Sequence, residues 1–175
     1  MRAVAFAAGL TLALAVPAAR GAQENGPLVR PAEVAAFAHA ASRHIWLVAP
    51  TLTSQEVADA LRRAAVERGV AVCLLAQHDQ ATFPASYVQG LSRLRGVQVR
   101  LAKRVEEAAL VIDDRYLIRG PLVYRVTVPG EPAETWHTDL RQMPMPPPLA
   151  RWLAALPTLW ERAVPYIYQP IFPGP

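Results

Sequence analysis

The chain has 175 residues, of which 53% are hydrophobic and 18% are charged, and its formal net charge is +4. This composition excludes an intrinsically disordered acidic or basic protein, and the length is sufficient for one domain with a hydrophobic core. Cys73 is the only cysteine, which excludes an intrachain disulfide, and its apolar surroundings in residues 70–75 predict a small core residue.

The first 22 residues have the pattern of a secretory signal peptide. Arg2 gives a positive start, residues 3–16 are apolar or small apart from one threonine, and small residues follow. The apolar run is shorter than the ~20 residues of a membrane-spanning helix, so we expect cleavage, after Ala18 or after Gly21. The alternative is an uncleaved N-terminal anchor. Cleavage would leave a periplasmic or secreted protein without a stable membrane span.

The rest of the chain divides into three parts. Residues 23–30 are expected to be a flexible leader, residues 31–164 a single domain, and residues 165–175 an irregular proline-rich tail whose aromatic side chains pack back onto the domain. Without Arg2 and Arg20, 16 basic residues oppose 14 acidic ones, a net charge of +2. Such a small excess gives little reason to expect a polyanionic partner.

In the first half of the domain, apolar runs alternate with helical patterns. Pro31 opens a helix, residues 45–49 form a buried strand, and Thr53 to Glu56 form a capping box for a second helix that ends at Gly69. Residues 70–75 are continuously apolar, which predicts a strand buried on both faces in a parallel sheet. Together these segments predict a βαβ unit.

The second half is expected to add strands at both sides. A short helix over 86–94 precedes an alternating strand over 97–101, and residues 109–112 and 116–118 form a hairpin around Asp113-Asp114-Arg115. The last expected elements are a strand over 122–128, an irregular stretch over 131–148, and an amphipathic helix over 149–163 that Pro157 kinks or splits.

Three of these segments resemble the phospholipase D superfamily, over about residues 32–163. They are the unit from Ile45 to Val70 with its Arg-Gly-Val step, the strand 96–100, and the sequence LVIDDRYLIRG at 110–120. The third is close to the hairpin that carries the family's HxKxxxxD motif and its trailing Gly-Ser. The resemblance implies an α/β fold: one domain with a mixed, mainly parallel sheet flanked by helices.

The resemblance also implies a chemistry. In the family, one histidine attacks phosphorus, a second protonates the leaving oxygen, and lysines hold the phosphoryl oxygens. When Asp113 is aligned with the motif aspartate, Glu106 occupies the histidine position and Ala108 the lysine position, while Gly120 matches the trailing glycine. Pro121 then stands in place of the serine.

No other register restores the motif. Lys103 is the only lysine, and none of the four histidines is followed by a lysine two residues later. A carboxylate at Glu106 repels a phosphodiester by ~1–4 kcal/mol at ~4 Å. We therefore expect no catalytic residues, and Glu106, Ala108, Asp113 and Gly120 are motif-equivalent positions only. No cofactor or metal is expected either, since no Cys/His pair has zinc-ligand spacing.

The sequence thus predicts a secreted, catalytically inactive phospholipase D-like domain that acts as a binding or assembly module. One alternative is a hydrolase with a rebuilt active site, for which His137-Thr138-Asp139 is the candidate cluster. Another is a protein that binds nucleic acid without cleavage. The candidate basic positions are Arg62, Arg63, Arg68, Arg93, Arg95, Arg100 and Arg104. A homodimer through the motif face is a further expectation, because single-motif members of the family pair two chains.

Overall fold

The computed structural model describes residues 28, 30–126, 133–138 and 145–167. The expected signal peptide, most of the leader and the tail from Tyr168 onward lie outside the described residues. In chain order the elements are α1 (Pro31–His39), β1 (His44–Ala49), α2 (Gln55–Arg68), β2 (Ala71–Gln77), α3 (Val88–Ser92), β3 (Val97–Ala102), β4 (Ala109–Ile112), β5 (Tyr116–Arg119), the 3-10 helix η1 (Pro121–Val123), β6 (Glu134–His137), α4 (Pro147–Arg162) and β7 (Val164–Pro165).

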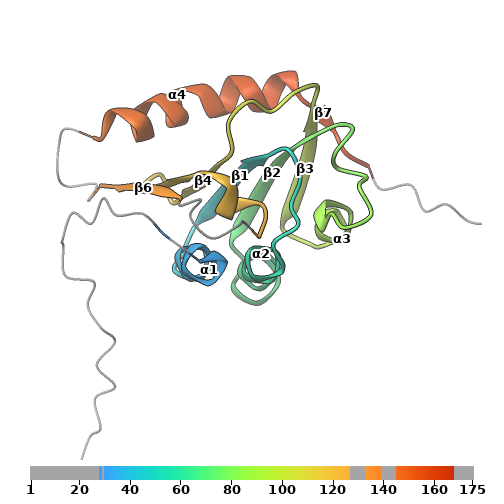
Figure 1. Ribbon diagram of the computed structural model, residues 1–175, viewed down its shortest axis with the longest axis horizontal. Helices are drawn as coiled ribbons and strands as arrows, with labels where there is room; N and C mark the ends of the chain where they lie inside the picture. The colour runs from blue at the N-terminus through green and yellow to red at the C-terminus, as the bar shows by residue number, and fades with distance from the viewer. Residues whose placement is uncertain (1–27, 29, 127–132, 139–144, 168–175) are drawn as a thin grey trace, which may run out of the picture.

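The strands form one seven-stranded sheet in the order β6-β5-β4-β1-β2-β3-β7. The three central strands β1, β2 and β3 are parallel, and β4 to β7 add antiparallel neighbours at both sides. Helices α1, α2 and α3 cover one face of the sheet, whereas α4 crosses the other (Figure 1). The mixed sheet flanked by helices is the architecture that the sequence predicts.

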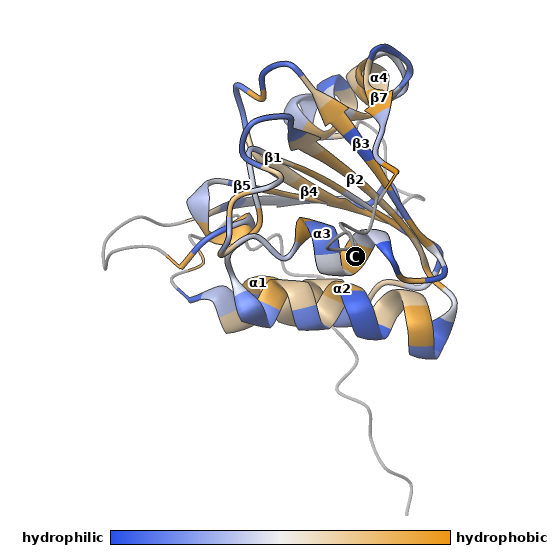
Figure 2. Cartoon of the chain, turned by 90° about the vertical axis from the view of Figure 1, so that its right-hand side faces the viewer, coloured by the Kyte–Doolittle hydropathy of each residue, from blue (hydrophilic) through white to orange (hydrophobic). Residues whose placement is uncertain are grey.

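Strand residues alternate between two apolar layers. Ile45, Leu47 and Leu74 point into the larger core beneath α1 and α2. Val48 and Leu75 point the other way, into a smaller core that α4 covers. Figure 2 shows the largely apolar strands enclosed between these helices. Burial on both faces explains the unbroken apolar runs of β1 and β2.

Helix α2 begins one residue later than predicted. Its N-cap is Ser54, whose hydroxyl accepts a hydrogen bond from the Val57 amide at 3.4 Å, so the capping box expected at Thr53 is wrong. The amides of Thr53 and Ser54 both donate to the carbonyl oxygen of Tyr124, at 2.6 and 3.1 Å. This distant partner satisfies the Thr53 amide, which a pattern of neighbouring residues cannot reveal. The predicted end is confirmed, with Gly69 at φ 70°.

Two segments of the second half differ from the prediction. No strand forms over residues 122–126; after Gly120, at φ 117°, Pro121 starts η1 and buries Leu122 and Val123. The apolar run therefore reflects burial in a turn, because Pro121 fixes φ and cannot donate a hydrogen bond to a sheet. Conversely, the stretch expected to be irregular contains β6, which pairs with β5.

The C-terminal segment is more regular than expected. Helix α4 continues through Pro157 without being split, since Leu149, Trp152 and Leu156 pack into the smaller core and Pro157 is on the exposed side. Val164 and Pro165 form β7 beside β3, where an irregular tail was expected. The Tyr166 amide donates to the Val99 carbonyl at 2.9 Å and the Tyr166 side chain packs against the larger core, as expected, whereas Ile167 is 77% exposed.

One arginine connects the carboxyl ends of the first two helices. Arg68, at the end of α2, donates to the carbonyl oxygens of Ala38 at 3.1 Å and Ala41 at 2.9 Å, and also to that of His39. These carbonyls lie at the end of α1, where helical partners run out and the helix dipole favours a cation.

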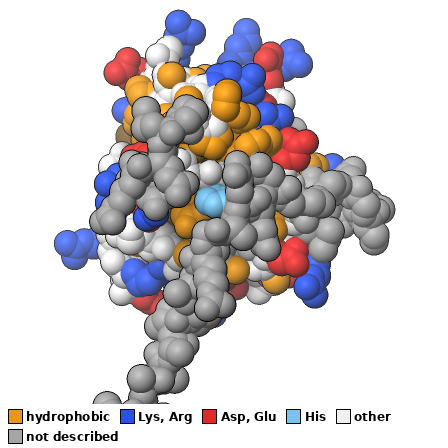
Figure 3. All heavy atoms as spheres, turned by 90° about the vertical axis from the view of Figure 1, so that its left-hand side faces the viewer, with side chains coloured by type: hydrophobic (Ala, Val, Ile, Leu, Met, Phe, Trp, Pro, Cys, Tyr) orange, Lys and Arg blue, Asp and Glu red, His pale blue; other side chains and the backbone are white. Residues whose placement is uncertain are grey.

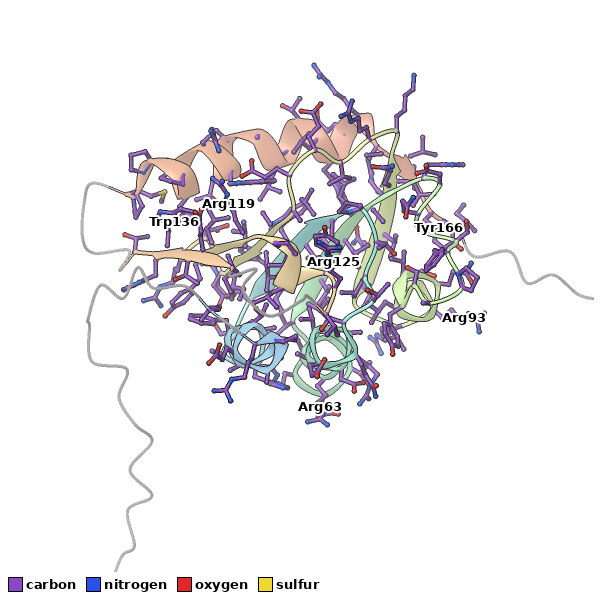
Figure 4. All side chains as sticks on the ribbon, in the orientation of Figure 1. Arg63, Arg93, Arg119, Arg125, Trp136 and Tyr166 are labelled. Carbon is purple, nitrogen blue, oxygen red and sulfur yellow. The ribbon has the colours of Figure 1, made fainter. Side chains whose placement is uncertain are left out.

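We predict that Arg68→Ala lowers the free energy of unfolding by about 1–2 kcal/mol, because it leaves these carbonyls without their charged donor. Urea denaturation measures the effect. Arg63→Ala is the matched control, since Arg63 lies on the same helix and points into solvent (Figure 4); it should change stability by less than about 0.5 kcal/mol. Equal effects of the two substitutions would contradict the assigned role.

Candidate functional site

The hairpin of β4 and β5 places the motif-equivalent positions at two different ends. Ala108 immediately precedes β4 and Asp113 immediately follows it, so they are separated by five strand steps, about 16 Å. Glu106 and Gly120 lie at the Ala108 end, because Ala109 is paired with Arg119. The structure therefore brings three of the four positions together and places Asp113 apart.

A cleft of about 410 Å³ occupies the Ala108 end of the hairpin. Pro50, directly after β1, forms part of its wall, so the cleft lies at the carboxyl end of a central parallel strand. Ligands of open α/β sheets bind at this edge. The lining residues are Pro50, Glu106, Glu107, Ala108, Arg119, Gly120, Pro121, Tyr124 and Glu134.

Ion pairs organise the charged groups of the cleft. Arg119 Nε lies 2.5 Å from Glu107 Oε1, and Arg119 Nη2 lies 3.8 Å from Glu134 Oε2. Arg151, on α4, places Nη2 3.6 Å from Glu107 Oε2. The Arg119 guanidinium also lies over the ring of Trp136, 5.1 Å from its centroid, beneath α4 (Figure 4). The cation of the lining is thus held by two carboxylates and an aromatic face.

The described lining of the cleft differs from the motif that the hairpin resembles. None of the lining residues is a histidine or a lysine. Glu106 is exposed and has no hydrogen bond or ion pair within the described part of the chain, and Ala108 presents only a methyl group. The lining carries three carboxylates against one guanidinium, so it disfavours an anion and suits a cationic or neutral group.

Asp113 has a structural role at the far end of the hairpin. Its Oδ2 accepts from the amide and hydroxyl of Ser42, both at 2.8 Å, and its Oδ1 accepts from the amides of Arg43 at 2.8 Å and His44 at 3.0 Å. Burial alone would raise the pKa of Asp113, but these four hydrogen bonds outweigh it and hold the pKa below the ordinary aspartate value.

The turn around Asp113 is itself unusual. Asp113 and Asp114 have φ angles of 53° and 59°, and the Arg115 amide donates to the Ile112 carbonyl at 2.9 Å, as in a type I′ hairpin turn. Left-handed residues other than glycine cost about 1–2 kcal/mol each. The hydrogen bonds of Asp113 offset this strain, so the carboxylate explains why an aspartate stands at this position.

The structure does not place His137 in the cleft. Its ring stacks on Tyr116 with centroids 6.0 Å apart, and Tyr116 in turn contacts Phe37 of α1. His137 pairs with Tyr116 at the turn end of the hairpin, three strand positions, about 10 Å, from Glu134. Thr138 donates to the Arg115 carbonyl, and Asp139 lies outside the described residues. His137 therefore lies at the turn end of the hairpin, where Asp113 is, and away from Glu106, Ala108 and Gly120.

Sequence reasoning missed a second cavity, of about 340 Å³, beyond the carboxyl ends of β2 and β3. His78, Asp79 and Lys103 all line it. His78 and Lys103 are 25 residues apart in sequence, but Gln77 pairs with Ala102 in the sheet, which brings the following residues side by side. The proximity of His78 and Lys103 follows from the register of β2 and β3, which the sequence alone does not determine.

The candidate basic positions do not form one surface. Arg62 is within 3.7 Å of Asp59 and 3.9 Å of Glu67, and Arg100 donates to the Trp160 carbonyl at 2.7 Å. Arg63 on α2 and Arg93 after α3 lie apart (Figure 4). On the face at the β6 end of the sheet, basic and acidic side chains are interspersed (Figure 3).

Two further observations concern the described residues only. In this part of the chain, no three His, Cys, Asp or Glu side chains gather closely enough to hold a metal ion. Nor does any helix here have both the length and the apolar character that crossing a bilayer requires.

Comparison with known proteins identifies the fold. No protein-family model and no curated protein matches the chain. Among solved structures, NucT from Helicobacter pylori matches 83% of this chain and 100% of its own, with a TM-score of 0.65 and 16% identity. Nuc from Salmonella typhimurium, a phospholipase D family member, matches 82% of this chain and 100% of its own, with a TM-score of 0.59 and 18% identity.

The chain has the phospholipase D fold. TrmBL2, an archaeal chromatin protein, also matches, over 81% of this chain and 53% of its own, with a TM-score of 0.57 and 15% identity. The phospholipase D architecture expected from the hairpin sequence is therefore confirmed, and the fold occurs both in a phospholipase D family member and in a chromatin protein.

We predict that Asp113→Asn lowers the free energy of unfolding by about 2–4 kcal/mol. Asparagine tolerates the left-handed conformation, but its amide group faces donors and leaves them unpaired. Denaturant unfolding measures the loss. Asp114→Asn is the matched control, because Asp114 has the same backbone conformation. Its contacts are ion pairs with Arg43 and His44 that are partly exposed to solvent, so the expected loss of unfolding free energy is below about 1 kcal/mol.

The lowered pKa of Asp113 also predicts a pH dependence. A carboxyl group with a lower pKa in the folded state stabilises the fold above its unfolded pKa, about 3.9, and loses this contribution as the pH falls through the folded value. The stability difference between the wild type and Asp113→Asn should therefore shrink below about pH 4. Parallel pH profiles of the two proteins would contradict the prediction.

Proposed function

We propose that the protein is a catalytically inactive domain of phospholipase D fold that serves as a binding or assembly module. The observation that carries this proposal is the composition of the cleft at the motif-equivalent positions. Glu106 and Ala108 take the places of a nucleophilic imidazole and a phosphate-binding ammonium group. Phosphoryl transfer needs both, and losing one member of such a unit typically costs several orders of magnitude in rate.

The electrostatics of the cleft support the same conclusion. Glu106, Glu107 and Glu134 surround the place where the phosphate would bind, and the only cation of the described lining, Arg119, is engaged by two of them. A phosphodiester would meet repulsion of ~1–4 kcal/mol from each carboxylate at ~4 Å. The cleft is therefore better suited to a cationic or neutral group of a partner than to a phosphodiester.

The cavity at β2 and β3 supports a second candidate function, a hydrolase with a rebuilt site. It brings together one histidine, one aspartate and the only lysine of the chain, His78, Asp79 and Lys103. His78 can act as a nucleophile or a base, and Lys103 provides a cation. This alternative therefore depends on His78 and not on His137, because the His137 ring stacks on Tyr116 at the turn end of the hairpin.

Nucleic-acid binding without cleavage has less support. TrmBL2 is described as binding DNA in a novel mode, and it shares the fold with this chain. Here, however, Arg62, Arg68 and Arg100 are occupied by carboxylates or helix carbonyls. A nucleic-acid footprint needs basic groups clustered on one face.

Secretion is part of the proposal. It is supported by the apolar run at residues 3–16 behind Arg2 and by the small residues that follow. We expect the mature protein to begin after Ala18 or Gly21, which N-terminal sequencing of the protein recovered from the periplasm or the culture medium would show. Recovery of the intact N-terminus in the membrane fraction would instead identify an uncleaved anchor.

We predict that the purified mature protein does not hydrolyse bis-p-nitrophenyl phosphate above the buffer rate, because the described lining of the cleft offers neither a histidine nor a lysine. The assay includes Glu106→Ala and His78→Ala, one variant for each cavity. Hydrolysis that Glu106→Ala abolishes would overturn the proposed inactivity at the motif cleft. Hydrolysis that His78→Ala alone abolishes would instead establish the rebuilt site.

A further inference from the structure

Two arginines from different elements converge on one carboxylate in the cleft. Arg119 comes from β5 and Arg151 from α4, and their nitrogen atoms lie 2.5 and 3.6 Å from the two oxygens of Glu107. Guanidinium groups are the cations that proteins favour for binding carboxylate and phosphate groups. In this chain the bound acid is one of its own side chains.

We propose that Arg119 and Arg151 form an oxyanion site, and that Glu107 occupies it. The ligand class is a small oxyanion, a phosphate or a carboxylate group. This inference deepens the proposed function, on which it rests, because it names the residue that keeps both arginines from an incoming anion.

The surroundings hold Arg119 in place independently of Glu107. Its guanidinium lies over Trp136, and Glu134 lies within 3.8 Å of Nη2. The Arg119 side chain is only 28% exposed, so charges beside it are screened less than at the surface. Arg151 is 67% exposed and can reach either Glu107 or an incoming anion. Removing Glu107 therefore leaves one fixed and one adaptable guanidinium.

Glu107 has the advantage over any dissolved anion because it is tethered. It stands directly beside the hairpin, and its side chain is 38% exposed. A tethered group competes as if it were present at a high local concentration, on the order of millimolar or more. Its neighbour Glu106 faces the same cleft without a described contact. Of the two adjacent glutamates, only Glu107 is therefore paired with the two arginines.

The test is a calorimetric titration of inorganic phosphate and, separately, of acetate into the full mature protein. Wild type, Glu107→Ala and the matched control Glu106→Ala are compared at equal ionic strength. We expect Glu107→Ala to bind at least one of the two anions about tenfold more tightly than the wild type, and Glu106→Ala, which removes a charge of the lining but frees no guanidinium, to raise the affinity by a smaller factor. The stronger of the two ligands identifies the shape of oxyanion that the site prefers.

Two further variants keep the outcome interpretable. Glu107→Gln serves if Glu107→Ala does not fold, since it removes the charge and keeps the shape. Adding Arg119→Gln to Glu107→Ala should abolish the gained affinity. Equal affinities of Glu107→Ala and Glu106→Ala, or a gain that survives Arg119→Gln, would overturn the proposal.

The two proposals fail separately. Hydrolysis of a phosphodiester by the wild-type protein would refute the proposed inactivity, whereas the titration reports only on anion binding by the arginines. Tryptophan fluorescence provides a second readout for the site, because Arg119 covers Trp136. The fluorescence is measured in Glu107→Ala as anion is added. A fluorescence change that the additional substitution Trp136→Phe removes supports binding at this position, and one that persists contradicts it.

Discussion

The carboxylate of Asp113 is the interaction on which the architecture of the site depends. It accepts hydrogen bonds from the amides of Ser42, Arg43 and His44, where the chain enters β1, and so fixes the turn of the β4–β5 hairpin against the start of the first central strand. With that turn fixed, the antiparallel register of β4 on β1 follows, and Leu110 faces Leu47. The other end of the hairpin is then carried to the carboxyl edge of the sheet, where the cleft forms.

Most charged side chains of the cleft are paired with one another. Glu107 receives Arg119 from the sheet and Arg151 from α4, so one short loop connects both layers that flank the smaller core. Such partly exposed ion pairs contribute little to stability, typically below about 1 kcal/mol each. Their main effect is on the electrostatic potential of the cleft, since they neutralise the Arg119 guanidinium.

Much of the fold follows from local sequence, and the exceptions have physical causes. The apolar runs of β1 and β2, Gly69 and the hairpin around Asp113 are predictable because burial and turn geometry constrain those residues directly. The strand expected after Gly120 fails because a buried turn requires apolar residues too. Strand β6 is missed because it has four residues and only a sheet edge to support it. The departures from the HxKxxxxD pattern at Glu106 and Ala108 are visible in sequence, whereas the Glu107 ion pairs and the His78–Lys103 cavity depend on register and on α4.

The separation between Asp113 and Ala108 has a consequence for design. One end of the β4–β5 hairpin is anchored by four hydrogen bonds, while Glu106 and Glu107 near the other end are at least partly exposed. These two positions can therefore be varied while the anchor is left intact, whereas Gly120, at φ 117°, and Pro121, which starts η1, are constrained by their backbone conformation. The loop that precedes β4 is thus the place at which to engineer this domain.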